Sequence, residues 1–169
     1  GGRLLIGVKD NGVIAGVKNE EDIYVVEEAA SLYCSPEIEL RFTAFRVDGG
    51  LTVMRAEIEA AADRRPVMVC EADGRMRAYY RVADENIAAP DLMVRSWRES
   101  STGQLLRLTD AERSAMTLLD SCGYLTAESL ATHAAISVST ASDIIISLHA
   151  MGLVKWSYSG GTFRLVAVG

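Results

Sequence analysis

The feature that most constrains this chain is a turn signal between two apolar runs at its beginning. The triplet Asp10-Asn11-Gly12 separates residues 4–8 from residues 13–17. Asn and Gly tolerate the positive φ angles of tight hairpin turns, so the pattern predicts a β-hairpin. Gly7 and Gly16 interrupt the two strands, which usually marks a bulge or the close approach of another backbone segment.

The segment that follows alternates between helical and strand periodicity. Residues 20–33 show apolar side chains at helical spacing after Asn19, a good N-cap, and predict an amphipathic helix with Tyr33 on its inner face. Residues 38–47 and 51–58 alternate apolar and polar side chains around a glycine turn. They predict a second hairpin, with a bulge near Phe45-Arg46.

Shorter elements precede a change of composition near residue 100. Residues 67–70 and 76–82 read as strands and residues 91–97 as a short helix. Residues 99–104 are polar with Gly and Ser, as in a linker. We therefore expect two domains, covering residues 1–100 and 105–169.

The last segment predicts three helices and a hairpin. Thr109 with Glu112 forms a capping-box pattern for the first helix, and Thr126 caps the second. The third helix is expected from about Ser139 to Met151, and two strands follow over residues 153–158 and 162–168. This order of elements resembles a winged helix-turn-helix domain.

The first 100 residues also resemble a known family. The double glycine, the strand ending Ile6-Gly7-Val8, the Asp-Asn-Gly turn and the late strand Tyr79-Tyr80-Arg81-Val82 are similar to the AlbA-like DNA-binding domain of the Schlafen type. The resemblance implies an α+β, AlbA-like domain and a homodimer that binds DNA, with RNA as the alternative. Asp84-Glu85-Asn86 is similar to a bacterial subgroup that adds a winged helix, so the expected function is transcriptional regulation.

The family resemblance also raises an enzymatic alternative, a metal-dependent RNA nuclease. Some Schlafen proteins have a metal site resembling three carboxylates, two from a helix before the double glycine and one after the first strand. This sequence begins at Gly1, and only Asp10 matches that pattern. A hard divalent cation needs several oxygen ligands, and Asp is also favoured in turns of this kind. We therefore expect a structural role for Asp10, with no metal site and no enzymatic activity.

The sequence gives little support for a nucleotide cofactor, a zinc site, disulfide bonds or a membrane span. The sequence lacks the G-x-x-x-x-G-K-[ST] phosphate-binding loop, so we expect no nucleotide cofactor, although related proteins are loosely labelled ATP-binding. Three cysteines without C-x-x-C spacing favour neither a zinc site nor a disulfide framework. No run approaches the roughly 18 apolar residues of a membrane span, and we expect a cytoplasmic protein.

The charge balance argues against broad electrostatic attraction to nucleic acid. The formal net charge is −6; residues 1–104 hold 13 basic and 18 acidic side chains, and residues 105–169 hold 4 and 5. Nucleic-acid binders usually show a basic surface, because phosphate contacts supply most of the affinity. A local basic patch is therefore required. The alternative is a protein-interaction or dimerisation module without direct DNA contact.

Arginines of the N-terminal half are the first candidates for such a patch. If the loop at residues 64–66 folds beside a hairpin at residues 75–81, these arginines form one basic strip: Arg64, Arg65, Arg75, Arg77 and Arg81. The simpler interpretation of the last three is an outward strand face.

The predicted winged helix supplies a second set of candidates. The start of its third helix would enter the major groove, where hydroxyl groups can donate to phosphates or base edges. The hydroxyls in question belong to Ser137, Ser139 and Thr140. Asp143 would repel the DNA backbone and we expect no arginine or lysine near it, so Lys155 in the wing and Arg113 are the only expected phosphate clamps.

Overall fold

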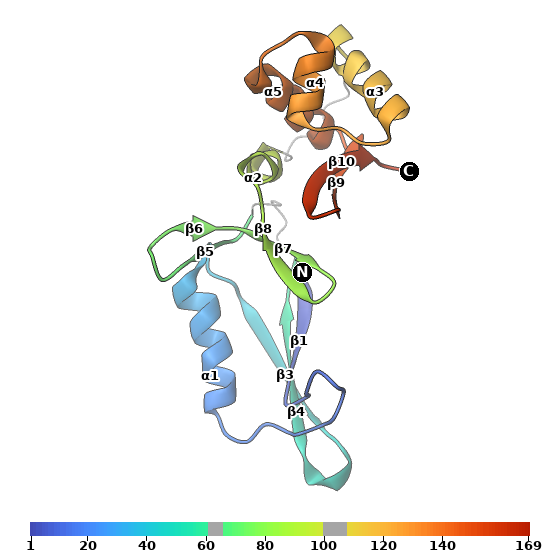
Figure 1. Cartoon of the computed structure of the whole chain (residues 1–169). Helices are drawn as coiled ribbons and strands as arrows, with labels where there is room; N and C mark the ends of the chain where they lie inside the picture. The colour runs from blue at the N-terminus through green and yellow to red at the C-terminus, as the bar shows by residue number, and fades with distance from the viewer. Residues whose placement is uncertain (61–65, 100–107) are drawn as a thin grey trace. The chain divides into compact units, whose positions relative to one another are not determined.

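The computed structural model describes residues 1–60, 66–99 and 108–169, which form two compact units (Figure 1). The N-terminal unit contains residues 1–60 and 67–78. The C-terminal unit contains Pro66 and the described residues from Tyr79 to Gly169. Helices and strands occur in both units, and the chain is an α+β protein, as predicted.

The N-terminal unit is built on a three-stranded antiparallel sheet in the order β1-β4-β3. Its strands are β1 (Gly2–Ile6), β3 (Leu40–Arg46) and β4 (Thr52–Ile58), and the turn η2 (Asp48–Gly50) joins β3 to β4. The predicted second hairpin is confirmed. The predicted bulge is wrong, because Phe45 pairs with Val53 and Arg46 with Thr52 in unbroken register.

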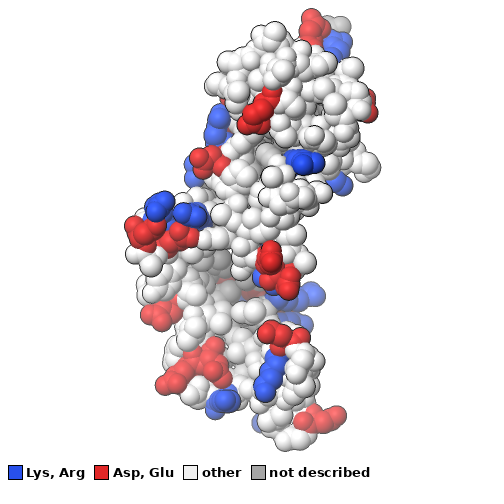
Figure 2. All heavy atoms as spheres, viewed as in Figure 1, with Lys and Arg blue, Asp and Glu red and all other residues white. Residues whose placement is uncertain are grey.

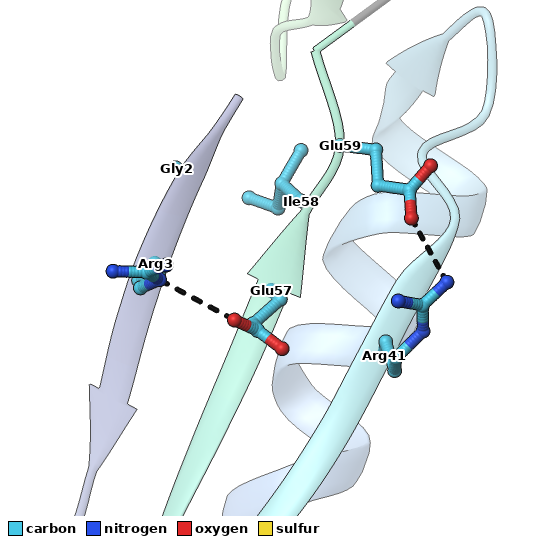
Figure 3. A pocket seen from close by; sticks show the side chains of 6 residues that line it. All are labelled: Gly2, Arg3, Arg41, Glu57, Ile58 and Glu59. Atoms are coloured by element: carbon cyan, nitrogen blue, oxygen red, sulfur yellow. Dashed lines mark hydrogen bonds and ion pairs between the residues drawn. The ribbon is translucent and has the colours of Figure 1, made fainter.

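The two faces of this sheet differ in character. Opposite residues in an antiparallel ladder share a face. Leu4, Ala56 and Phe42 are aligned on the apolar face, while Arg3, Glu57 and Arg41 are aligned on the other. Figure 3 shows the helix of this unit behind the sheet and the charged side chains in front of it. We call the charged side the open sheet face.

The expected first hairpin is wrong in its strand pairing. β1 pairs with β4, from Gly2 opposite Ile58 to Ile6 opposite Met54. Residues 13–17 form no strand, and a single bridge joins Val8 to Ile14.

The physical reason for this different pairing lies in Gly7 and Gly16. Both have positive φ angles, +95° and +73°, which end a regular ladder. A Cβ atom on Gly7 would lie 2.7 Å from the carbonyl carbon of Gly16, so the predicted close backbone approach is confirmed.

The predicted first helix occurs in two parts, α1 (Glu21–Glu28) and the π-helical turn η1 (Ala29–Tyr33). Glu20 is the N-cap residue in place of Asn19, and the Asp22 carboxylate accepts a hydrogen bond from the Lys18 N–H at 2.9 Å. The wider turn rotates the last residues of the helix, and Tyr33 is exposed instead of facing inward.

The predicted strand at residues 76–82 is divided between two sheets. β6 (Met76–Arg77) joins β2 (Cys34–Ser35) and β5 (Met68–Cys70) in the N-terminal unit, in the order β2-β5-β6. β7 (Tyr79–Val82) forms a hairpin with β8 (Glu85–Ala88) in the C-terminal unit. The buried Ala78 lies between β6 and β7.

Three consecutive helices and a hairpin make up most of the C-terminal unit. They are α3 (Asp110–Cys122), α4 (Ala127–Ala134), α5 (Val138–Ala150), β9 (Val154–Ser159) and β10 (Thr162–Ala167). The capping box of Thr109 and Glu112 is confirmed, as is the Thr126 cap. Gly123 follows α3 in a left-handed conformation. Buried side chains of all these elements form one core, which includes Leu119, Leu130, Ile145, Leu148 and Leu165.

Helix α2 (Asp91–Glu99) packs within this same unit. Leu92 packs against the core, and the Trp156 indole N–H donates to the hydroxyl oxygen of the fully buried Ser96 at 2.9 Å. Trp97 stacks on Tyr80. The contacts thus group residues 79–99 with the C-terminal helices, whereas the expected linker at 99–104 lies outside the described residues, Glu99 excepted.

Candidate nucleic-acid interface

The five arginines expected to form one strip do not form one described surface. Arg75 and Arg77 belong to the N-terminal unit and Arg81 to the C-terminal unit. Arg64 and Arg65 lie outside the described residues.

Carboxylates compensate two of the strip arginines. Arg75 Nε lies 2.7 Å from Asp73 Oδ2, and Arg77 Nε lies 3.0 Å from Glu71 Oε2. Arg81 differs, because its guanidinium donates to the Ala83 carbonyl oxygen and the Asn86 side-chain oxygen, both at 3.1 Å and both uncharged. A phosphate would therefore compete with a carboxylate for Arg75 and for Arg77. At Arg81 it would compete, among the described residues, only with hydrogen bonds to these two uncharged oxygens.

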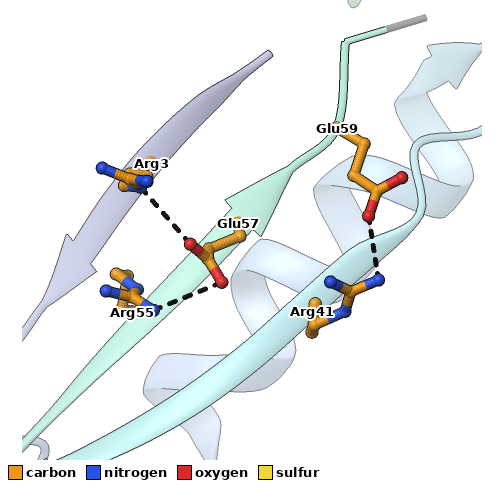
Figure 4. Close-up of polar contacts among 5 residues, drawn as sticks. All are labelled: Arg3, Arg41, Arg55, Glu57 and Glu59. Carbon is orange, nitrogen blue, oxygen red and sulfur yellow. Dashed lines mark hydrogen bonds and ion pairs between the residues drawn. The ribbon is translucent and has the colours of Figure 1, made fainter.

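The open sheet face of the N-terminal unit carries three arginines that the sequence analysis did not select. Glu57 lies between two of them, with its carboxylate oxygens 3.3 Å from Arg3 Nε and 3.3 Å from Arg55 Nη2 (Figure 4). Arg41 Nη2 lies 2.8 Å from Glu59 Oε1. Alternation along the strands indicated this face, but only the pairing of β1 with β4 brings Arg3 to it.

An open hollow of about 480 Å³ lies at the end of this face (Figure 3). Arg3, Arg41, Glu57 and Glu59 line it together with Gly2 and Ile58. Its charged groups balance, so an anion would gain contacts with the two guanidinium groups only by displacing carboxylates. Exposed ion pairs of this kind contribute about 0–1 kcal/mol each, which makes such displacement energetically small.

Arg55 is the most enclosed of these arginines. Its guanidinium lies over the Phe45 ring, 4.9 Å from the centroid, and its Nε is buried with no hydrogen-bond partner among the described residues. Phe45 is itself 40% exposed. An aromatic ring beside an arginine on an open sheet is a surface on which a nucleic-acid base can stack.

In the C-terminal unit, the hydroxyls at the start of α5 serve the helix itself. Ser137 Oγ accepts the Thr140 N–H at 3.0 Å and lies 2.8 Å from Thr140 Oγ1. Both residues and Ser139 are exposed. The two capping hydroxyls retain further hydrogen-bonding capacity toward solvent or a ligand.

The structure brings a basic residue to Asp143 that the sequence did not reveal. Arg95 of α2 reaches α5, and its Nη2 lies 3.0 Å from Asp143 Oδ1. The expectation that no arginine or lysine is near Asp143 is therefore wrong, because 48 residues of sequence separate the two partners. The pair compensates the negative charge that would repel a DNA backbone from α5.

The hairpin of β9 and β10 carries a second cation beside Lys155. Lys155 is opposite Val166 and Arg164 is opposite Ser157, so both basic side chains lie on the same outer face. Neither strand contains an acidic residue. The Arg164 guanidinium lies 4.4 Å from the centroid of the Tyr124 ring, which holds it at the surface of the unit.

Comparison with protein families assigns the first part of the chain. Residues 1–90, just over half of the chain, match the model for Schlafen, AlbA_2. The chain belongs to this family. The family suggests a function related to nucleic acids. No curated protein and no solved structure matches the chain.

The carboxylate that resembles part of the Schlafen nuclease pattern lies in a turn. Asp10 is exposed and lies in a turn that is closed by a hydrogen bond from the Gly12 N–H to the Lys9 carbonyl oxygen, at 2.8 Å. Across the described residues, no group of three His, Cys, Asp or Glu side chains is arranged to hold a metal ion.

Charges of both signs are interspersed on this Schlafen-family protein. Figure 2 shows basic and acidic side chains alternating over the visible face. No single described helix is long and apolar enough to span a membrane. The pair of α4 and α5 meets both criteria only when the two are taken together, and the angle between them is 114°.

Proposed function

We propose that this protein is a transcriptional regulator that binds DNA as a homodimer. The observation that carries the proposal is its membership of the Schlafen AlbA_2 family, over residues 1–90. The C-terminal elements support it, because α3, α4, α5 and the β9–β10 hairpin follow one another in the order of a winged helix-turn-helix domain.

Two sets of side chains are the proposed contacts with nucleic acid. In the C-terminal unit they are the exposed hydroxyls at the start of α5, Arg95, which offsets Asp143, and the cations of the wing. The other candidates precede residue 100: they are Arg64, Arg65 and Arg81, together with Arg75 and Arg77, which must exchange a carboxylate for a phosphate. We propose that these five arginines dominate, since residues 105–169 hold only four basic side chains.

The salt dependence of binding tests this ranking. Replacing Arg64 and Arg65 together with alanine should weaken binding to a DNA duplex and lower the slope of log K against log salt by about 0.9 for each lost phosphate contact. Arg98→Ala is the control, because it removes an exposed cation that is not among the proposed contacts. Fluorescence anisotropy at several salt concentrations, on DNA and on RNA of equal length, gives both quantities.

Three results of that titration have different meanings. A smaller slope for the double variant alone supports the ranking. If Lys155→Ala weakens binding and the double variant does not, the C-terminal unit is the binder. If the intact chain shows no salt-dependent binding to either nucleic acid, the protein acts as an interaction module instead.

The proposed homodimer rests on the edges of the N-terminal sheet. In the order β1-β4-β3, strands β1 and β3 each have one edge that no strand of the described residues covers. Open edges favour pairing with another chain, and two-fold assemblies are the commonest oligomers. We expect light scattering at tens of micromolar protein to give the mass of two chains; the mass of one chain would exclude the dimer.

An interaction module is the second candidate, and one specific observation favours it. The helix α1 and the following turn η1 of the N-terminal unit expose several large apolar side chains, among them Val25 and Leu32. Monomeric proteins seldom leave such side chains gathered on one surface unless a partner covers them.

A further inference from the structure

The outer face of α1 and η1 is the most apolar exposed helix surface of the N-terminal unit. Its large side chains are Tyr24, Val25, Leu32 and Tyr33, with exposed fractions of 59, 66, 67 and 52%. The inner face is also apolar, with Ile23 and Val26 half-buried and Ala30 buried. A helix that is apolar on both faces is normally covered on both.

The four exposed side chains lie on one surface. Tyr24 and Leu32 are eight residues apart, close to two helical turns, and so are Val25 and Tyr33. The π-helical turn contributes, because its additional residue per turn brings Tyr33 onto the side of the helix where Val25 lies. We call this surface the α1 outer face.

Acidic side chains stand within and beside the α1 outer face. Glu28 lies between Tyr24 and Leu32, four residues from each, and Glu21 lies three residues before Tyr24. Both are exposed, and no basic residue occurs between Glu20 and Leu40. The surface therefore combines apolar area with negative charge.

This chemistry excludes several occupants of the α1 outer face. A DNA or RNA backbone and an anionic membrane surface would be repelled by the carboxylates. A second copy related by a two-fold axis would bring the glutamates of both chains together, because an isologous interface uses the same patch twice. A cationic and apolar partner gains from both features, and its cations can also contact the tyrosine rings.

We propose that the α1 outer face binds a partner protein through an amphipathic helix whose apolar stripe is flanked by lysine or arginine. The side chains of Tyr24, Val25, Leu32 and Tyr33 pack against the apolar stripe of this partner helix. Glu21 and Glu28 select the basic flanks and disfavour acidic ones. This interaction is separate from the proposed contacts with nucleic acid and uses none of their residues.

Designed peptides test this proposal on the intact chain. The probe is a fluorescent helix of about five turns with a leucine stripe and lysine flanks, and its matched control has the same stripe with glutamate flanks. We expect the lysine peptide to bind and the glutamate peptide not to bind. The double variant Val25→Asp/Leu32→Asp should weaken binding by about tenfold or more, although it adds negative charge.

Two further variants separate the α1 outer face from diffuse attraction. Val138→Asp/Val168→Asp changes two valines of the C-terminal unit, each 49% exposed, and should leave the affinity unchanged. Glu21→Lys/Glu28→Lys should reverse the preference between the two peptides, and it preserves the apolar side chains.

Three outcomes overturn the proposal. The first is equal binding of the lysine peptide by the wild type and by Val25→Asp/Leu32→Asp, which would indicate charge attraction alone. The second is no binding of the lysine peptide by the wild type. The third is a wild-type dimer in sedimentation that Val25→Asp/Leu32→Asp converts to a monomer, which would make a second copy the occupant.

Discussion

Replacing Met93 with alanine is expected to lower the free energy of unfolding of the C-terminal unit by about 2–5 kcal/mol. Met93 lies in α2 and is fully buried. Truncating a buried methionine removes its apolar contacts and leaves a cavity, and the cost falls in this range. The result decides whether α2 is part of the same cooperative unit as α3, α4 and α5.

Tryptophan fluorescence measures this unit selectively. The chain has two tryptophans, Trp97 in α2 and Trp156 in β9, and both belong to the C-terminal unit. Urea unfolding followed by their emission should show a lower midpoint for Met93→Ala. Arg98→Ala, an exposed change in the same helix, should alter stability by no more than about 0.5 kcal/mol. An unchanged midpoint for Met93→Ala would place α2 outside the cooperative unit.

Such a result would also bear on the organisation of the family domain. The match to Schlafen, AlbA_2 ends at residue 90, directly before α2. The hairpin of β7 and β8 lies within the match, yet Tyr80 contacts Phe163 of β10 and Trp97 of α2. The expected division into residues 1–100 and 105–169 stays a prediction about domains, whereas the contacts define compact units that divide the chain after Ala78.

Local signals made the C-terminal elements predictable. Thr109 and Glu112 lie three residues apart and set the start of α3, while Gly123 ends it in a left-handed conformation. Each of these signals acts within one helical turn, so a single sequence contains all of the information. The same holds for the β3–β4 hairpin, where Asp48 and two glycines join adjacent strands.

Long-range pairing explains most of what the sequence did not reveal. The Asp10-Asn11-Gly12 turn forms, but β1 gains five paired positions with β4, about 50 residues away, instead of extending a hairpin with residues 13–17. Strand alternation through residues 76–82 is also unbroken, so it contains no sign that Ala78 separates two sheets. The strip of arginines was divided for this reason.

Long-range contacts also explain which residues of the proposed sites the sequence did not reveal. Arg3 reaches the open sheet face only through the pairing of β1 with β4, and Arg95 reaches Asp143 only through the packing of α2 on α5. Sequence spacing within one element cannot identify such neighbours. The hydroxyls at the start of α5 were identifiable because helix N-caps have a local signature.

The second large effect is expected at Glu112, a buried carboxylate that joins two helices. Its Oε2 accepts from the Thr109 N–H at 2.7 Å and its Oε1 from the Ser147 hydroxyl of α5 at 2.6 Å. Glu112→Ala removes the reciprocal cap of α3 and leaves a half-buried hydroxyl without its acceptor. Together these losses should destabilise the C-terminal unit by about 2–4 kcal/mol. Glu128→Ala, an exposed change in the first turn of α4, should have a small effect.

The pH dependence of stability gives an independent test of Glu112. Burial raises the pKa of its carboxyl, but the hydrogen bonds from Ser147 and Thr109 outweigh burial and lower the pKa below its ordinary value of 4.5. The folded unit therefore binds this proton less readily than the unfolded chain does. The stabilisation is complete above the unfolded pKa and is lost as the pH falls through the folded pKa. In urea titrations followed by tryptophan fluorescence, wild-type stability should fall more steeply below about pH 4.5 than that of Glu112→Gln, whose side chain does not titrate. Parallel curves for the two proteins would show that the Glu112 carboxylate contributes no stability through its charge.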